Sequence, residues 1–384
     1  MRISLLTYST KPRGGVVHTL SLAEALATLG HQVEVWTLGR GGDPGFYRPV
    51  ATEVRLRVVP FSDRAGEPVG TRIVRSIGEL SAALARDGLA GEVVHAQDCL
   101  SANAALRVRP DTLRTVHHID QFHTPELVAC HEKAIREPCG HLCVSRAVAD
   151  ELARDWGIRA EVIPNGVDSA RFAAAASDDP SALAERDRWR GKLGRYVLAV
   201  GGIEPRKGTA ELVESMALLR AREPAVALVL AGGDTLFDYR GYRDAVLARA
   251  AELGLDPVLL GPVPHEELPS LVAAASVFAF PSTKEGFGLA AMEALAARVP
   301  LVLRDLPVLR EVFDGAARFA APALGPGETA SPVSAAGALA EAVAAALGPT
   351  DLTLTTRGVK LAERHTWSAA AAAHLRFYRE RLDP

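Results

Sequence analysis

The feature that most constrains the fold is an alternation of strand-like and helix-like segments that runs along the chain, stops and then begins again. Helical patterns such as 15–29 and 146–156 fall between several β-rich runs of the first series. These runs are 2–9, 31–38, 54–61, 92–98, 113–118 and 141–145. Such alternation is typical of βαβ units around a parallel sheet.

Residues 171–194 interrupt the pattern, because they are rich in polar and small residues and show no strand period. A second series follows, with strands at 195–202, 225–233, 257–263, 277–282 and 299–305 and helices at 208–221, 241–254, 265–274 and 287–297. Its strands are continuous apolar runs, as expected where helices cover both faces of a sheet.

The two series predict an α/β protein with two Rossmann-like, doubly wound domains. A chain of 384 residues is also too long for one ordinary core. We place the first domain at 1–172 and the second at 173–365. A last helix, at about 366–382, could pack back onto the first domain. In open parallel sheets ligands bind at the carboxyl ends of the strands, so we expect the site in the cleft between the domains.

Composition excludes several classes of protein. The net charge is −3, with 43 basic and 46 acidic residues, so no global attraction to nucleic acid is expected. No apolar run approaches the roughly 18–20 residues that span a bilayer. The first residues, "MRISLLTYSTKPRGG", lack the long apolar part and cleavage site of a signal peptide. We therefore expect a cytoplasmic protein.

The cysteines predict neither a disulfide framework nor a metal site. There are four in 384 residues, too few for a disulfide framework. A cluster with nearby histidines (Cys130, His131, Cys139, His141 and Cys143) lacks the CxxC spacing of a zinc site, so we expect core packing and no metal. The basic region 54–76 is a candidate for contact at the inner face of a membrane, with a solvated face as the alternative.

The stretch "TKEGFGLAAMEA" (283–294) predicts an anion site. The turn Gly286-Phe287-Gly288 leads into a helix of good helix formers that begins at Leu289. Free backbone N–H groups and the positive end of the helix dipole meet at such a point. Two carboxylates, Glu285 and Glu293, flank the turn. Carboxylates only accept hydrogen bonds, so they suit the hydroxyl groups of sugars on either side of a phosphate.

A second stretch, "GGIEPRKG" (201–208), supplies positive charge between a strand and a helix. Gly202 precedes Arg206 and Lys207, and the chain contains only six lysines. A lysine acts as a point charge and an arginine as a fork for phosphate oxygens, so the pair suits a diphosphate. A nucleotide sugar combines such a diphosphate with two sets of hydroxyls.

These stretches, together with "IPNGVDSARF" (163–172) and residues 261–302, closely resemble the retaining GT-B glycosyltransferases of family 4, also called glycosyl transferases group 1. The resemblance implies a nucleotide-sugar donor held mainly by the second domain and no metal requirement. It also implies that the equivalent of Glu293 binds ribose hydroxyls, that of Glu285 contacts the donor sugar and that of Lys207 neutralises the diphosphate. Many members have an arginine where this chain has Gly202, and Arg206 could supply that charge.

The first domain contributes weaker signals. Gly14 and Gly15 open the helix 15–29 and match the glycine loop of the family, so their N–H groups can face donor phosphates. His117 ends a strand at the position of an active-site histidine in many members, which implies that it faces the transferred sugar, with a structural role as the alternative. His118, Asp120 and Asp98 are candidates for the acceptor side, with a structural role as the alternative for each. Lys11 and Arg13 border the glycine loop and could attract an anionic acceptor or the donor, with ordinary surface charges as the alternative.

The expected function is therefore transfer of a hexose from a UDP- or GDP-linked sugar to a hydroxyl acceptor, with retention and without a cofactor. A sugar-nucleotide epimerase of the same fold and a non-catalytic sugar-nucleotide binder stay open. A dehydrogenase is disfavoured because "TYSTKPRGG" lacks the GxGxxG spacing. The sequence leaves open the nucleotide base, the hexose, the acceptor and the oligomeric state.

Overall fold

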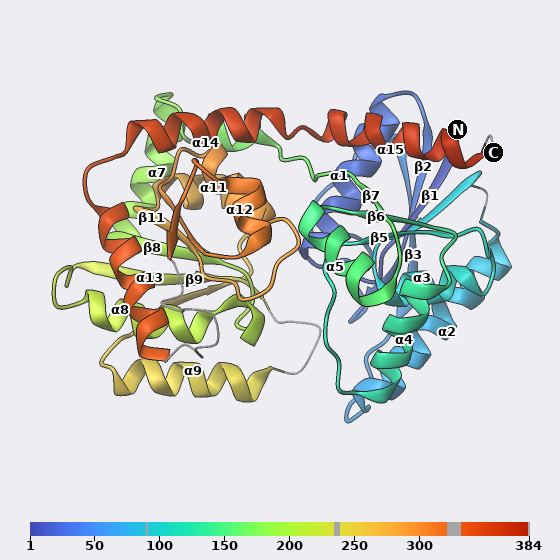
Figure 1. Cartoon of the computed structure of the whole chain (residues 1–384), viewed down its shortest axis with the longest axis horizontal. Helices are drawn as coiled ribbons and strands as arrows, with labels where there is room; N and C mark the ends of the chain where they lie inside the picture. Colours follow the sequence, from blue (N-terminus) through green and yellow to red (C-terminus); the bar gives the residue numbers. More distant parts are fainter. Residues whose placement is uncertain (90, 234–238, 321–331, 383–384) are drawn as a thin grey trace. The chain divides into compact units, whose positions relative to one another are not determined.

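A computed structural model describes residues 1–89, 91–233, 239–320 and 332–382. The chain forms two compact units (Figure 1). Unit 1 comprises Met1–Gly166 and His365–Pro384, and unit 2 comprises Val167–Arg364. The expected α/β class with two doubly wound sheets is confirmed, since each unit is built on one parallel sheet with helices on both faces.

Unit 1 has a seven-stranded sheet in the order β3-β2-β1-β4-β5-β6-β7. The strands are β1 (Arg2–Leu6), β2 (Gln32–Arg40), β3 (Val54–Phe61), β4 (Val93–Ala96), β5 (Leu113–Val116), β6 (Gly140–Cys143) and β7 (Glu161–Val162). The helices are α1 (Gly14–Thr28), α2 (Val69–Asp87), α3 (Cys99–Leu106), α4 (Pro125–Arg136), α5 (Arg146–Trp156) and α15 (Trp367–Leu382). All neighbouring strands are parallel, so their carboxyl ends share one edge.

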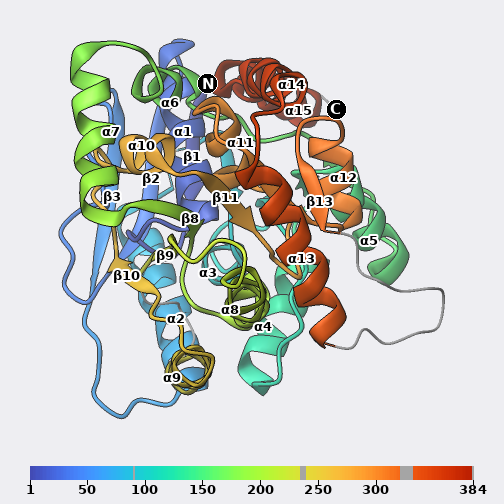
Figure 2. The same ribbon diagram turned by 90° about the vertical axis from the view of Figure 1, so that its left-hand side faces the viewer.

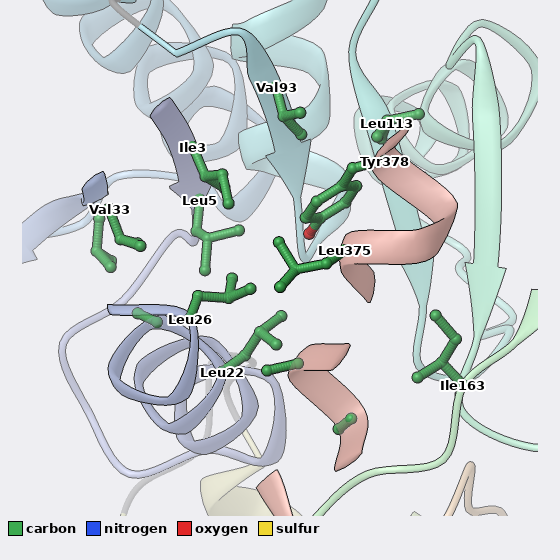
Figure 3. Close-up of a cluster of buried hydrophobic side chains, with 14 of the residues drawn as sticks. Ile3, Leu5, Leu22, Leu26, Val33, Val93, Leu113, Ile163, Leu375 and Tyr378 are labelled. Atoms are coloured by element: carbon green, nitrogen blue, oxygen red, sulfur yellow. The ribbon is translucent and has the colours of Figure 1, made fainter. Parts of the chain in front are cut away.

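The C-terminal helix is part of the core of unit 1. Figure 3 shows Leu22 and Leu26 of α1 beside Leu375 and Tyr378 of α15, with strand residues such as Leu5 against them. The hydroxyl of Tyr378 also lies 2.7 Å from Nδ1 of the buried His95 on β4. Helix α15 therefore covers the sheet together with α1, although about 200 residues of unit 2 separate the two parts of unit 1 in the sequence.

Unit 2 has a six-stranded parallel sheet in the order β10-β9-β8-β11-β12-β13. The strands are β8 (Arg195–Val200), β9 (Val226–Ala231), β10 (Val258–Gly261), β11 (Val277–Phe280), β12 (Leu301–Arg304) and β13 (Arg318–Ala320). The helices are α6 (Ser169–Ala175), α7 (Pro180–Leu193), the 3-10 turn η1 (Pro205–Lys207), α8 (Thr209–Leu219), α9 (Arg240–Glu252), α10 (Leu268–Ala274), α11 (Leu289–Ala296), α12 (Pro307–Phe313), α13 (Pro332–Leu347) and α14 (Leu352–Arg364). Helices α8, α9 and α13 pack on one face, while α6, α7, α10 and α11 form a separate group (Figure 2).

The observed boundary between the units corrects the expected one. It lies at 166/167 rather than at 172/173, because α6 packs on α10 and α11 and so belongs to unit 2. The side chain of Phe172 on α6 is fully buried. The second boundary lies at 364/365, one residue before the expected one. The segment 171–194, which shows no strand pattern, forms the end of α6 and all of α7.

Candidate functional site

Two loops of unit 2 meet at the carboxyl edge of its sheet because β8 and β11 are neighbours there. The loop after β8 ends at Gly208, whose φ of +67° is the left-handed conformation that glycine adopts without strain. A Cβ atom at this position would collide with the carbonyl oxygen of Pro281, which follows β11. The amide of Thr283 donates to the carbonyl of Arg206 at 2.8 Å. The close approach of the two backbones therefore requires a glycine.

An ion cluster joins these two loops. The ammonium of Lys207 donates to Oε1 of Glu285 at 2.6 Å, and a guanidinium nitrogen of Arg206 contacts the same oxygen at 3.2 Å. Arg206 also donates to Glu204 at 2.7 Å. The side chains of Lys207 and Glu285 are only 20% and 10% exposed, so solvent screens the pair weakly. We call these four residues the ion cluster.

The ion cluster fixes the charge of its central carboxylate. Burial acts to raise the pKa of Glu285, but the charges of Lys207 and Arg206 outweigh it and lower that pKa to about 2. Burial and the nearby Arg206 lower the pKa of Lys207, while Glu285 opposes this effect. The sequence predicted both cations and this carboxylate for one ligand, and the structure brings them into direct contact. It adds Glu204, whose signal was its place two residues before Arg206 in "GGIEPRKG".

The glycine turn before α11 leaves the start of that helix open. Gly288 is the N-cap, with φ at +99°, and among the described residues no side chain caps the helix. A Cβ atom at Gly288 would lie 2.9 Å from the ring of Phe313, so this position also favours glycine. Phe287 is buried and anchors the turn. The first-turn N–H groups of α11 begin at Leu289, where the sequence predicts an anion site, and a helix start of this kind is suited to an anion.

Glu293 lies on α11 beyond this turn, apart from the ion cluster. Burial raises its pKa to about 7, with Arg171 acting to lower it and Asp168 to raise it. Arg171 and Asp168 come from α6 and its N-cap, and α6 packs on α11. Sequence reasoning did not assign a role to Arg171, although it lies in the "IPNGVDSARF" stretch.

We expect the Glu293→Gln substitution to stabilise unit 2 at high pH. The folded protein holds the proton of Glu293 up to about pH 7, whereas the ordinary value is 4.5. The native state therefore binds more protons than the unfolded chain between these values, and its stability falls as pH rises through this window. Glutamine cannot ionise, so the variant should gain roughly 1–3 kcal/mol relative to wild type between pH 4.5 and pH 8.

Urea unfolding at pH 4.5 and pH 8 measures this difference. The matched control is Glu363→Gln, because Glu363 is an exposed carboxylate on α14 of the same unit. That variant should follow the wild-type pH dependence. Parallel pH profiles for Glu293→Gln and wild type would show that Glu293 is ionised without cost in the folded state.

In unit 1 the predicted histidine lies against the predicted glycine turn. A Cβ atom at Gly15 would lie 3.7 Å from the ring of His117, and Nε2 of His117 is 3.2 Å from Oε1 of Gln97. The rings of His18 and His117 pack edge to face with centroids 4.8 Å apart. Burial lowers the pKa of His117 well below 6.5, so its ring is neutral at pH 7. Gly14 opens α1, and no side chain caps that helix among the described residues.

The other candidates in unit 1 have partners of their own. Asp98 caps α3, accepting from the amide of Ser101 at 2.8 Å, and burial raises its pKa. Nε2 of His118 lies 2.9 Å from Oδ2 of Asp120. Lys11 pairs with Asp43 at 2.8 Å, which ties the loop after β1 to the connection between β2 and β3. Asp98 and Lys11 therefore each have a structural role, as a helix cap and as an ion-pair partner.

The described parts of the chain contain no helix long and apolar enough to cross a membrane. Within the same residues, no group of three or more histidine, cysteine or acidic side chains is arranged to hold a metal ion. In the basic region, Arg75 is bound by Glu67 at 2.7 Å and Glu79 at 3.0 Å, so part of its charge is neutralised.

Known proteins resemble the chain along most of its length. The profile described as Glycosyl transferases group 1 matches residues 185–347, and that described as Glycosyltransferase Family 4 matches residues 12–171. The MMP alpha-(1->4)-mannosyltransferase of Mycolicibacterium hassiacum is 29% identical over 381 residues, covering 84% of this chain and 86% of the relative. The phosphatidyl-myo-inositol mannosyltransferase of Mycolicibacterium smegmatis is 28% identical over 399 residues, covering 98% and 93%.

Solved structures show the same fold at lower identity. The sucrose-phosphate synthase of Thermosynechococcus elongatus superposes with a TM-score of 0.74 at 22% identity, covering 99% of this chain and 98% of the other. HepE of Anabaena, solved with UDP and glucose, has a TM-score of 0.74 at 19% identity, covering 99% and 100%. At such identities the likeness establishes the architecture alone.

Proposed function

Since the chain belongs to the group 1 glycosyltransferases of the GT-B fold, we propose that it transfers a hexose from a nucleoside-diphosphate sugar to a hydroxyl acceptor with retention at the anomeric carbon. The observation that carries the proposal is the ion cluster beside the open start of α11. It combines two cations, backbone donors and a carboxylate within one loop pair, which is the set of groups that a diphosphate joined to a sugar requires.

In this proposal each group has a distinct role. Lys207 and Arg206 neutralise the diphosphate, together with the N–H groups at Phe287, Gly288 and Leu289. Glu285 accepts hydrogen bonds from the hexose, and Glu293 accepts them from the ribose. Gly202, Gly286, Gly14 and Gly15 let the backbone approach the donor closely. His117 is neutral, so it acts on the transferred sugar as a hydrogen-bonding group rather than as a charge.

The names of similar proteins support the donor class. Both relatives described above are mannosyltransferases, and HepE was solved with UDP. A second structure of HepE contains UDP-glucose. A UDP- or GDP-linked hexose is therefore the donor that we propose. Lys207 and Arg206 supply positive charge where the leaving group forms, so the proposed reaction needs no metal ion and no further cofactor.

The proposed chemistry exchanges one bond for another at the anomeric carbon. The bond from that carbon to the diphosphate oxygen breaks, and a bond to the acceptor oxygen forms on the same face. The acceptor proton passes to the leaving phosphate oxygen, so charge and atoms balance. The two-carboxylate route of retaining hydrolases needs a nucleophile about 5–5.5 Å from the acid. Glu285 does not suit that role, because both cations hold its Oε1.

Thermal unfolding with UDP, GDP, ADP or dTDP tests the donor site. A nucleotide at 100 times its Kd should stabilise the folded protein by about 2.7 kcal/mol. We expect one base to be preferred and the shift to persist in EDTA, since arginine and lysine replace the metal. Loss of the shift in Lys207→Ala and Glu293→Ala would place the ligand on unit 2. The absence of a shift with every nucleotide would contradict the proposal.

A further inference from the structure

Three arginines lie at the carboxyl edge of the sheet of unit 1, one beside the glycine turn at Gly14 and one in the basic region 54–76. Arg13 ends the loop after β1, Arg40 ends β2, and Arg72 lies in the first turn of α2. Arg40 is paired in register with Phe61 of β3, and its guanidinium lies 5.6 Å from the centre of that ring. Arg13 lies over the ring of Tyr8 at 5.9 Å. We call Arg13, Arg40 and Arg72 the arginine cluster.

Helix geometry brings Arg72 toward the same aromatic ring. Arg75 is three residues further along α2, so the two arginines project from the same side of the helix. The guanidinium of Arg75 lies 4.0 Å from the centre of the Phe61 ring. Burial is the largest cause that lowers the pKa of Arg40. The charges of Arg72 and Arg13 lower this pKa further, as expected for like charges held close together. Tyr8 and Asp63 act in the opposite direction.

Among the residues that the structure describes, Arg40 and Arg72 differ from Arg48 and Arg75 in lacking an acidic partner. Arg48 forms two hydrogen bonds of 2.7 Å with Glu24, and Arg75 is held by Glu67 and Glu79. Within the described residues, neither Arg40 nor Arg72 has a carboxylate oxygen within 4.0 Å. The Nε atom of Arg72 is buried and has no hydrogen-bond partner there. An unpaired buried donor and two adjacent like charges both cost stability, so a ligand that satisfied them would be favoured.

We propose that Arg40 and Arg72 bind a phosphate group carried by the acceptor. The guanidinium fork matches the oxygens of a phosphate, and a phosphate dianion would neutralise two arginines at once. The identification of the ligand as the acceptor rests on the proposed function, because unit 1 holds His117 at the same edge of the sheet, whereas the charged donor groups Arg206, Lys207 and Glu285 lie in unit 2. The phosphate can belong to a soluble sugar phosphate or to a phospholipid headgroup.

Calorimetric titration of anions tests the site independently of the donor. The protein is first saturated with a nucleoside diphosphate, which fills the ion cluster of unit 2. Inorganic phosphate, mannose 6-phosphate and mannose are then titrated at constant ionic strength. We expect the two phosphates to bind and mannose to bind at least tenfold more weakly. Arg40→Gln and Arg72→Gln should each raise the Kd for phosphate at least tenfold.

The matched control is Arg86→Gln, which removes one positive charge from the exposed far end of α2 and should change the Kd less than twofold. Arg40→Lys keeps the charge and loses the fork, so its Kd should lie between those of wild type and Arg40→Gln.

The melting temperature of Arg40→Gln should not fall below that of wild type, because the substitution removes a repulsion. A purely structural arginine would instead lose stability.

Vesicles distinguish the two sources of phosphate. Cosedimentation with phosphatidylglycerol in phosphatidylcholine, compared with phosphatidylcholine alone, should depend on Arg40 and Arg72 if the acceptor is a lipid. Phosphate binding in solution without such dependence supports a soluble acceptor. Equal affinities in wild type, Arg40→Gln and Arg72→Gln for every anion and vesicle would overturn the inference. Failure of the proposed function would show separately, as an absence of nucleoside-diphosphate binding.

Discussion

Replacing Lys207 with alanine is expected to lower kcat for hexose transfer by about 10²–10³-fold, the usual effect of removing one preorganised group that stabilises developing charge. In the proposed reaction, the leaving diphosphate gains negative charge as the anomeric bond breaks. Lys207 lies 2.6 Å from Glu285 in a poorly exposed cluster, so its charge is held in place before the reaction starts. Its loss also leaves Glu285 with Arg206 alone at 3.2 Å, and the pKa of Glu285 should rise from about 2.

Steady-state kinetics with the donor identified by thermal unfolding measures this effect. Lys192→Ala is the control, because Lys192 is an exposed lysine of the same unit on α7. The Lys207→Ala, Glu285→Gln double variant separates the two contributions of the lysine. The double variant removes the carboxylate that Lys207→Ala leaves with Arg206 as its remaining cation, so it should recover part of the lost stability. Its kcat should stay low, because it still lacks the charge of Lys207. A wild-type kcat in Lys207→Ala would exclude Lys207 from the reaction.

Replacing Gly208 with alanine is expected to destabilise the protein by about 3 kcal/mol. The left-handed φ of +67° costs alanine roughly 1–2 kcal/mol. The added Cβ also collides with the carbonyl oxygen of Pro281, which is backbone and cannot rotate away. The loops after β8 and β11 must therefore move apart. Because Lys207 is the adjacent residue, nucleoside-diphosphate affinity should fall together with stability.

Chemical unfolding and nucleotide titration of the same variant measure both effects. Gly337→Ala is the control, since Gly337 lies inside α13, has ordinary helical φ and would place its Cβ in open space. That substitution should stabilise the protein by about 0.5–1 kcal/mol, because alanine loses less backbone entropy than glycine in a helix. Unchanged stability in Gly208→Ala would show that the two loops can separate without cost.

Much of the architecture could be predicted because the signals for it are local. A strand that is buried on both faces is a continuous apolar run, and a helix that follows a strand has its own period. These patterns located strands such as β8 and β11 and helices such as α5 and α11 to within a few residues. The glycine turn at Gly288 could also be predicted from the sequence, since few residues other than glycine adopt a left-handed φ before a helix.

The boundary of unit 2 was harder to predict from the sequence, because the unit to which α6 belongs depends on the helices that α6 packs against. Its sequence, "SARFAAA", is compatible with a helix on either unit. The burial of Phe172 and the contacts with α10 and α11 decide the matter, and these are long-range. For the same reason the role of Arg171 beside Glu293 was not foreseen.

The sequence by itself determined that this chain forms two parallel α/β units, and it predicted a nucleotide-sugar site at one glycine turn with flanking carboxylates. Tertiary structure alone decided which of these residues touch. Strand β8 lies beside β11, although β9 and β10 come between them in the sequence, so Lys207 meets Glu285 across 78 residues. In unit 1, β2 ends at Arg40 beside β3, and among the described residues neither Arg40 nor Arg72 has a carboxylate oxygen within 4.0 Å. Periodicity is encoded by neighbouring residues, whereas strand order results from the packing of the whole unit.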